Sequence, residues 1–151
     1  MMSEATDPKA AAITSFCADI LITFAVGGFG SWCLIHEYKW AKDDADFNEP
    51  VEACADPAGT FVVVSNSEAD DEAERKKRHK LTPAEIEAAV KKLADPAVSS
   101  KELALHSSYR ATVFTAYSEY LNGDEFAAGD IDAELADYIV QVALFGEVVF
   151  S

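Results

Sequence analysis

The chain has 151 residues, and its 27 acidic and 12 basic side chains give it a formal net charge of −15. Charge of this size repels nucleic acid phosphates and anionic membranes, and it attracts basic partners. We therefore expect neither direct nucleic acid binding nor membrane association. Three cysteines without a C-x-x-C pair argue against a disulfide framework or a thiolate zinc site, and they favour a reducing cytoplasm.

The charge divides the sequence into three parts. Residues 1–74 hold 15 acids and 3 bases, residues 75–101 hold 3 acids and 8 bases, and residues 102–151 hold 9 acids and 1 base. Two acidic parts thus flank a basic middle part. Half of the residues are apolar, which at this length is enough to form the core of a single domain.

The N-terminal part is predicted to form a short frayed tail over residues 1–10 and then a buried helix. Apolar residues at spacings of three and four predict this helix over Ile13–Val26, and Gly27 and Gly28 are expected to end it. The uncharged run Ile20–Ile35 is shorter than the roughly 20 apolar residues of a spanning helix and is interrupted by glycines. A core helix is therefore favoured over a membrane span.

Strand patterns follow this helix. Alternation over Trp32–Trp40 predicts a strand whose aromatic face packs inward. The run Thr60–Ser65 predicts a strand buried on both faces, and Val51–Cys54 is the expected site of a short additional strand. These segments predict a small antiparallel sheet of about three strands.

The segment Ser65–Lys80 has no apolar residue larger than alanine and changes from acidic to basic midway, so residues 66–80 are predicted to be a charged linker or loop within the domain. Its basic block, Arg75–Lys80, has two interpretations. The acids just before it can neutralise it, or it can contact nucleic acid. The first is favoured because the rest of the surface would repel phosphate.

The remainder of the chain is predicted to be helical. Thr82 with Glu85 and Ser99 with Glu102 have capping-box spacing, which predicts one helix that ends before Pro96 and a second, the longest of the chain, that runs to Asn122. A last helix is expected to start at Asp130 or Asp132 and to end at Gly146, followed by a short edge strand or an apolar tail. The predicted fold is α+β, with four or so helices packed against the sheet in one domain.

No enzymatic signature is evident. Cys33 and His36 lie three residues apart on a predicted strand, so their side chains should point to opposite faces. The glycine-rich run Gly27–Gly30 follows a helix and precedes a strand, the reverse of a phosphate-binding loop. We expect no catalytic residue, and a small enzyme that depends on cysteine or histidine is the least favoured alternative.

Metal and cofactor sites are not expected either. The three histidines lack the short-range spacing of metal ligands. A calcium loop that starts at Asp124 would place Phe126 and Ala128 at ligand positions and Leu135 where a bidentate glutamate belongs. Helix capping explains the acids of this region more simply.

Two segments resemble known sequences. IDAELADYIVQVALFGEVVF, at Ile131–Phe150, and more loosely CADILITFAVGGFGSW, at Cys17–Trp32, resemble small uncharacterised proteins encoded by phages, plasmids and other mobile elements of high-GC bacteria. The resemblance implies a genetic context and supplies no catalytic residues. Mobile elements carry small acidic proteins of the anti-CRISPR and anti-restriction type.

The resulting hypothesis is an acidic, non-enzymatic inhibitor of a nucleic-acid-processing defence complex, active in the cytoplasm of the host cell. It would offer carboxylates to a basic nucleic-acid-binding surface of a host protein. Such binding needs no catalytic chemistry, because charge dominates the binding of DNA to such surfaces. The candidate contact acids form two patches, which are Asp43, Asp44, Asp46 and Glu49, and Asp124, Glu125, Asp130 and Asp132.

Two alternatives stay open. Acidity can serve solubility alone, in which case the carboxylates should be evenly scattered over the surface. The protein can also be a small oligomeric structural or accessory protein of a phage or plasmid, in which case an exposed apolar surface is expected, with Tyr138–Phe150 as the candidate homo-oligomer contact.

Overall fold

A computed structural model describes residues 8–27, 31–39, 57–124 and 126–150 of the chain. The strands are β1 (Cys33–Lys39), β2 (Phe61–Asn66) and β3 (His79–Leu81), and they form an antiparallel sheet in the order β1-β2-β3. The helices are α1 (Pro8–Gly27), α2 (Glu72–Lys76), α3 (Pro83–Ala94), α4 (Ser100–Leu103), α5 (Ser107–Leu121) and α6 (Ala133–Phe145), with 3-10 turns η2 (Pro57–Gly59) and η3 (Ala127–Asp130). The predicted α+β class with a three-stranded antiparallel sheet is confirmed.

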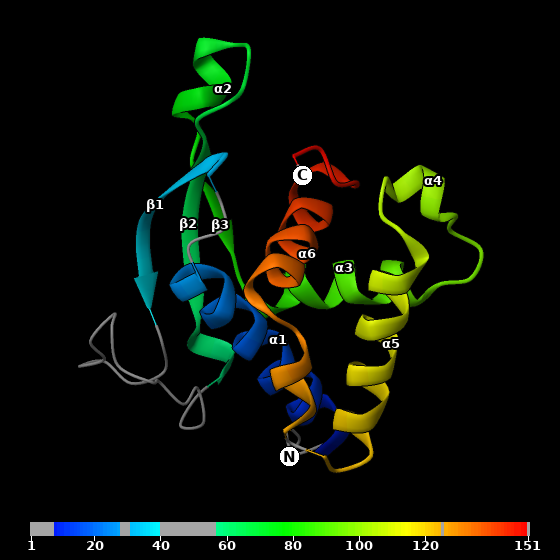
Figure 1. Cartoon of the computed structure of the whole chain (residues 1–151). Coiled ribbons are helices and arrows are strands. Elements are labelled where there is room, and N and C mark those ends of the chain that lie inside the picture. The colour runs from blue at the N-terminus through cyan, green and yellow to red at the C-terminus, as the bar shows by residue number, and fades with distance from the viewer. Residues whose placement is uncertain (1–7, 28–30, 40–56, 125, 151) are drawn as a thin grey trace.

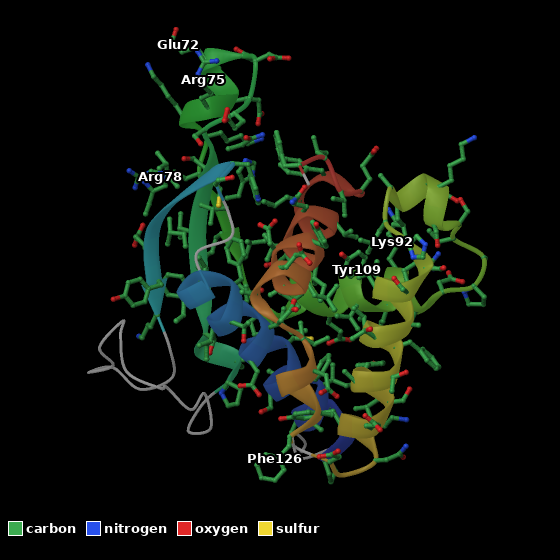
Figure 2. The ribbon with its side chains drawn as sticks, viewed as in Figure 1. Glu72, Arg75, Arg78, Lys92, Tyr109 and Phe126 are labelled. Carbon is green, nitrogen blue, oxygen red and sulfur yellow. The ribbon has the colours of Figure 1, made fainter. Side chains whose placement is uncertain are left out.

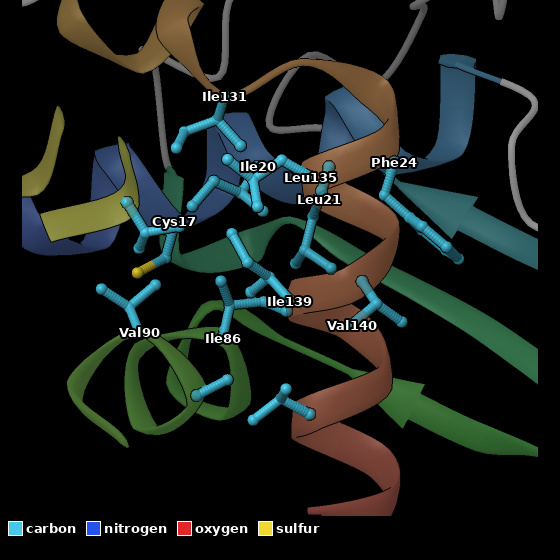
Figure 3. Packing of buried hydrophobic residues seen from close by; sticks show 14 of the residues in the cluster. Cys17, Ile20, Leu21, Phe24, Ile86, Val90, Ile131, Leu135, Ile139 and Val140 are labelled. Carbon is cyan, nitrogen blue, oxygen red and sulfur yellow. The ribbon is translucent and has the colours of Figure 1, made fainter. Parts of the chain in front are cut away.

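Helix α1 is the centre of the helical layer and contacts α3, α5 and α6 (Figure 1). Its buried stripe includes Phe16, Ile20, Leu21 and Phe24, as the apolar spacing predicted. Figure 3 shows Ile20, Leu21 and Phe24 packed against apolar residues of α3 and α6. Among the described residues α1 alone is long and apolar enough to cross a membrane, a criterion of length and composition that core helices also meet.

The end of α1 lies against the start of α6. A Cβ added at Gly27 would overlap the Cβ of Ala133. Gly27 belongs to the helix itself, so its role is to allow this close approach rather than to adopt the left-handed conformation expected from the sequence. Gly28 lies outside the described residues.

The inward aromatic face predicted for the first strand is wrong. Trp32 is buried just before β1 begins, whereas Tyr38 is 37% exposed and every residue of the strand after Cys33 is exposed. The strand has an irregularity in register at His36, and it forms an edge of the sheet on the side away from the helices (Figure 1). The helices therefore bury β2 and leave most of β1 in solvent; Trp40 lies outside the described residues.

The third strand was expected at Val51–Cys54, which lies outside the described residues, and β3 instead forms within the predicted linker. β3 pairs with β2 and buries Leu81 opposite Val62. Residues 67–78, which we name the arm, connect β2 to β3 and carry α2 at their far end (Figure 1). Local composition did not reveal this strand, because Leu81 is its only apolar residue. The strand forms through its pairing with β2.

The helix predicted from Ser99 to Asn122 is two helices. The capping box at Ser99 is present, but α4 ends after one turn, and Ala104 adopts a left-handed conformation with φ of 52°. A second start follows, where His106 caps α5 by accepting a hydrogen bond from the amide of Ser108. The longest described helix is thus α1, with 20 residues.

Arg110 holds this broken region together. Its guanidinium donates to the carbonyls of Leu93, Asp95 and Val98 at 2.9, 2.9 and 2.7 Å. These carbonyls lie at the C-terminal end of α3 and in the turn after it, where helical partners are missing. The only base after Lys101 therefore serves the fold.

Helix α6 begins as predicted, with Asp132 accepting a hydrogen bond from the amide of Leu135, and it ends at Gly146 with φ of 81°. The following residues form an apolar tail and no strand. Gln141 holds this tail, because its Oε1 accepts from the amides of Val149 and Phe150 at 2.8 and 2.7 Å and its Nε2 donates to the Phe150 carbonyl at 2.8 Å.

The same buried network reaches the strand side of the molecule. Asp137 accepts hydrogen bonds from the indole nitrogen of Trp32 at 2.7 Å and from Nε2 of Gln141 at 2.9 Å. Phe150 stacks on the Trp32 ring, with centroids 5.7 Å apart. We name Trp32, Asp137, Gln141 and the backbone of the tail the clamp, since it joins residues more than 100 positions apart.

Replacing Gln141 with leucine should destabilise the protein by about 2–4 kcal/mol, because two part-buried amides and a buried carboxylate lose their partners. Urea unfolding followed by circular dichroism measures this loss as a lower midpoint. As a control, exposed Glu147→Gln on the same tail should stay within about 0.5 kcal/mol of the wild type. A Q141L midpoint equal to the wild-type value would contradict the clamp.

Candidate functional site

The second patch of predicted contact acids lies on one connection of the fold. Asp124, Asp130 and Asp132 all belong to the segment between α5 and α6, at the end of the molecule that also holds the start of α1 (Figure 1). All three are exposed. Glu125 and the whole first patch, Asp43, Asp44, Asp46 and Glu49, lie outside the described residues.

Local structure accounts for two of these acids. A side-chain oxygen of Asp124 accepts a hydrogen bond from the amide of Phe126 at 3.1 Å, and Asp132 caps α6 through the amide of Leu135 at 2.9 Å. Both are turn and cap functions for which aspartate is well suited. Each carboxylate nevertheless remains in contact with solvent, so each also contributes to the surface charge.

An exposed aromatic side chain lies among these acids. Phe126 is 84% exposed, the largest fraction among the large apolar side chains described as exposed, and Figure 2 shows it projecting from this end of the molecule. Its neighbours Ala127 and Ile131 are buried and hold the connection against the core. We name Asp124, Phe126, Asp130 and Asp132 the acidic end.

The acidic end adjoins an uncharged helix surface. Asp130 lines an open hollow of about 410 Å³ together with Ala111, Thr112 and Thr115 of α5. From Ala111 to Ser151 the sequence contains eight acids and no base, so this part of the chain carries no positive charge of its own. The connection thus carries an exposed apolar side chain and three exposed carboxylates, a combination that suits the binding of a protein surface.

Among the residues that the structure describes, no side chains form an evident catalytic arrangement. His36 does not meet Cys33; its Nε2 lies 2.7 Å from Oγ of Ser65, on the opposite side of the sheet from the core. The hollow beside Asp130 and a second one of about 190 Å³ at the start of α3 are lined by neither histidine nor cysteine. Neither of these two hollows adjoins the histidine–serine pair, so neither would hold a substrate beside it.

The two cysteine thiols that the structure describes, those of Cys17 and Cys33, are also poorly suited to nucleophilic attack. Burial raises the pKa of Cys17 to about 12, and burial together with the nearby carboxylate of Asp137 raises the pKa of Cys33 to about 12. Both thiols therefore stay protonated at neutral pH, whereas attack requires the thiolate. Within the described residues no three side chains of the His, Cys, Asp and Glu types gather as metal ligands.

The candidate homo-oligomer segment Tyr138–Phe150 lies largely inside the fold. Ile139, Val140, Val142 and Val148 are buried, and Val149 is the member with a large exposed apolar side chain. The tyrosines of this region also pack internally, since the rings of Tyr109 and Tyr138 meet edge to face with centroids 5.4 Å apart. Apolar surface available to a second copy is thus small here.

Sequence reasoning did not identify Phe126 or the clamp. Phe126 was considered only as a residue at a calcium-ligand position, although an aromatic residue between two aspartates in a predicted turn is a detectable signal. The Trp32–Asp137 bond has no such signal, because 105 positions separate its partners. Comparison of the chain with protein-family models, curated proteins and solved structures finds no match.

The buried carboxyl of Asp137 should make stability depend on pH. Burial raises its pKa above the ordinary 3.8, and the bonds from Trp32 and Gln141 offset this only in part. Since the folded state then binds the proton more tightly than the unfolded chain, this group's contribution to the free energy of unfolding falls as pH rises from below 3.8 through the raised pKa.

Urea unfolding of the wild type and of Asp137→Asn, measured at several pH values from 3 to 7, isolates this group. The stability of the wild type relative to D137N should decrease across that pH window and then level off toward neutral pH. A difference that stays constant, or that increases with pH, would contradict a raised pKa in the folded state.

Proposed function

We propose that the protein is an acidic, non-enzymatic inhibitor of the anti-CRISPR or anti-restriction type. It would bind a basic nucleic-acid-binding surface of a host defence complex. The observation that supports the proposal is the acidic end, where the exposed Phe126 lies on the same connection as Asp124, Asp130 and Asp132, in a part of the chain that has no base. A second candidate function, an oligomeric accessory protein, has less support because Tyr138–Phe150 is largely buried.

Physically, the carboxylates would replace the phosphates for which the partner's Lys and Arg groove is built. Attraction between charges of opposite sign steers the encounter and is sensitive to salt. The aromatic side chain would supply the desolvated contact that charge alone lacks, since binding hot spots are usually aromatic and surrounded by groups that exclude water. The charges would thus set the association rate and the choice of partner, and the Phe126 contact would set how long the complex lasts.

The carboxylates of the arm contribute little to the net negative charge of the protein, because bases of the arm offset them. The arm carries five acids and four bases, so it is nearly neutral, and the excess of acid belongs to the rest of the chain. Ion pairs join Lys76 to Glu72 at 3.1 Å and Lys77 to Glu74 at 3.9 Å. This uneven distribution is better suited to a directed contact than to solubility alone, which an even scatter would serve.

The proposal is tested by capturing partners on the tagged protein from lysates of bacteria with defined defence systems, and by measuring inhibition as plasmid transformation in the same hosts. The variant Phe126→Ala/Asp130→Lys leaves both capping acids intact. It should weaken the Kd for the captured complex about 30-fold or more, because a hot-spot contact contributes about 2 kcal/mol. Rising salt should release the wild-type complex.

A matched control is Val149→Ala/Glu68→Lys, which makes the same kinds of change at exposed positions away from the acidic end. Its affinity and inhibition should equal those of the wild type. Reversal of Asp43, Asp44 and Asp46 to lysine tests the first patch separately. Recovery of the protein only as a salt-insensitive oligomer, without inhibition of any system, would reject the proposal and favour an accessory role.

A further inference from the structure

One acid of the acidic end differs from the other two in its surroundings. Asp124 and Asp132 each accept a hydrogen bond from a backbone amide, whereas the carboxylate of Asp130 forms no hydrogen bond or ion pair within the described residues. Asp130 is also exposed, so both of its carboxylate oxygens are available to a partner. Local structure thus does not account for this side chain as it does for the other two.

Asp130 shares a hollow with helix α5. The described residues that line this hollow of about 410 Å³ are Ala111, Thr112, Thr115 and Asp130. The turn η3, which ends at Asp130, packs against α5 (Figure 1), and buried residues such as Val113 and Ile131 hold the two elements in place. A side chain that enters the hollow would therefore meet a carboxylate from one element and hydroxyl groups from the other.

The two threonines add hydrogen-bond acceptors to the carboxylate. The hydroxyl of Thr112 donates to the carbonyl of Ser108 at 3.1 Å, so its hydrogen is used while its oxygen can still accept. The hydroxyl of Thr115 is exposed and has no partner among the described residues. The polar groups of the hollow therefore act mainly as acceptors, and they include one full negative charge.

The described lining of the hollow carries no positive charge. The sequence from Ala111 to Ser151 has no lysine or arginine. Lys9, near the start of α1 at the same end of the molecule, is not part of the lining (Figure 1). The complementary occupant is thus a positively charged group with several hydrogen-bond donors.

We propose that the hollow receives the guanidinium of an arginine from the partner protein, an inference that rests on the proposed function. The guanidinium is planar and permanently charged, and it carries five N–H donors. It can donate two parallel hydrogen bonds to the carboxylate of Asp130 and a further one to Oγ1 of Thr112 or Thr115. The methylene stem of the arginine would then lie along Ala111 and the threonine methyl groups.

The nature of the partner favours the same side chain. Arginine is widely used to bind phosphates, so a nucleic-acid-binding surface presents it. Lysine has the same charge, but its compact ammonium group cannot form two parallel bonds with one carboxylate. An arginine that normally holds a phosphate would thus find in Asp130 a carboxylate of suitable geometry.

Other occupants fit the hollow less well. Calcium takes about six to eight oxygen ligands, whereas the described lining supplies one carboxylate and two hydroxyl groups. An anion would be repelled by Asp130. A free small molecule is usually enclosed over about 70–90% of its surface, and this hollow is open, so a side chain from a partner that covers the hollow suits it better.

The experiment titrates the nitrogen-15-labelled full-length protein with N-acetyl-arginine amide and follows the backbone amide signals by NMR at constant ionic strength. The amides of Thr112, Thr115 and Asp130 should shift and approach saturation with a Kd of about 10 mM, since one side chain supplies only part of the affinity of an interface. N-acetyl-lysine amide should bind about threefold more weakly. N-acetyl-citrulline amide, similar in shape but uncharged, should cause no saturable shift.

Two variants test the groups that line the hollow. Asp130→Asn removes the charge and keeps the shape, so the arginine probe should bind about fivefold or more weakly. Thr115→Val removes an acceptor and should weaken binding about two- to fivefold. Both residues are exposed and their side chains have no partner among the described residues, so amide signals distant from the hollow should match those of the wild type.

The matched control is Asp70→Asn, which makes the same chemical change at an exposed acid of the arm. The arm and the acidic end lie at opposite ends of the molecule (Figure 2). Affinity of this control for the probe should stay within about 1.5-fold of the wild type. Equal losses in D130N and D70N would overturn the proposal, because they would indicate attraction to net charge. Equal affinity for the arginine and lysine probes, or wild-type shifts that do not saturate, would also overturn it.

The probe and the captured complex separate this proposal from the proposed function. Thr115→Val should weaken the Kd of the captured complex by a similar two- to fivefold. Capture that T115V leaves unchanged, although this variant has lost affinity for the probe, would overturn the role of the hollow and leave the proposed function intact. Specific binding of the arginine probe without any captured partner or inhibition would support the arginine site and reject the proposed function.

Discussion

The burial of one face of α1 is the constraint on which the rest of the structure depends. Three helices, α3, α5 and α6, pack against this single helix, and residues such as Phe16, Ile20 and Leu21 are fully buried at their junction. Each fully buried side chain of this size contributes about 1.5–3 kcal/mol, so the position of α1 fixes that of the others. The close approach at Gly27 sets how near α6 can lie.

The clamp adds direction to this apolar packing, which by itself is not specific for one arrangement. Asp137 and Gln141 lie on one side of α6, and together they hold Trp32 before the sheet and the backbone of the C-terminal tail. Buried polar groups are stable only when their bonding capacity is met, so this network favours one register of α6 against the strand side. It carries a cost in the buried charge of Asp137.

Charge is organised by the fold rather than distributed evenly. In the arm, acids and bases form ion pairs with each other. The guanidinium of Arg110 donates to carbonyls around the end of α3. The acidic end lies in a part of the chain that has no base.

The sequence by itself determined the helices α1, α3 and α6 and the buried strand β2, because their signals are local: apolar spacing, a capping box at Thr82, an N-cap aspartate at Asp132, and an uninterrupted apolar run. The tertiary structure alone decided that β1 is an exposed edge, that β3 forms from His79–Leu81, and that α4 and α5 are separate helices. It also decided that Phe126 is exposed on the same connection as Asp124, Asp130 and Asp132. These features depend on strand pairing and on hydrogen bonds between distant residues, such as those of Arg110 and Trp32, and no local pattern records such partners.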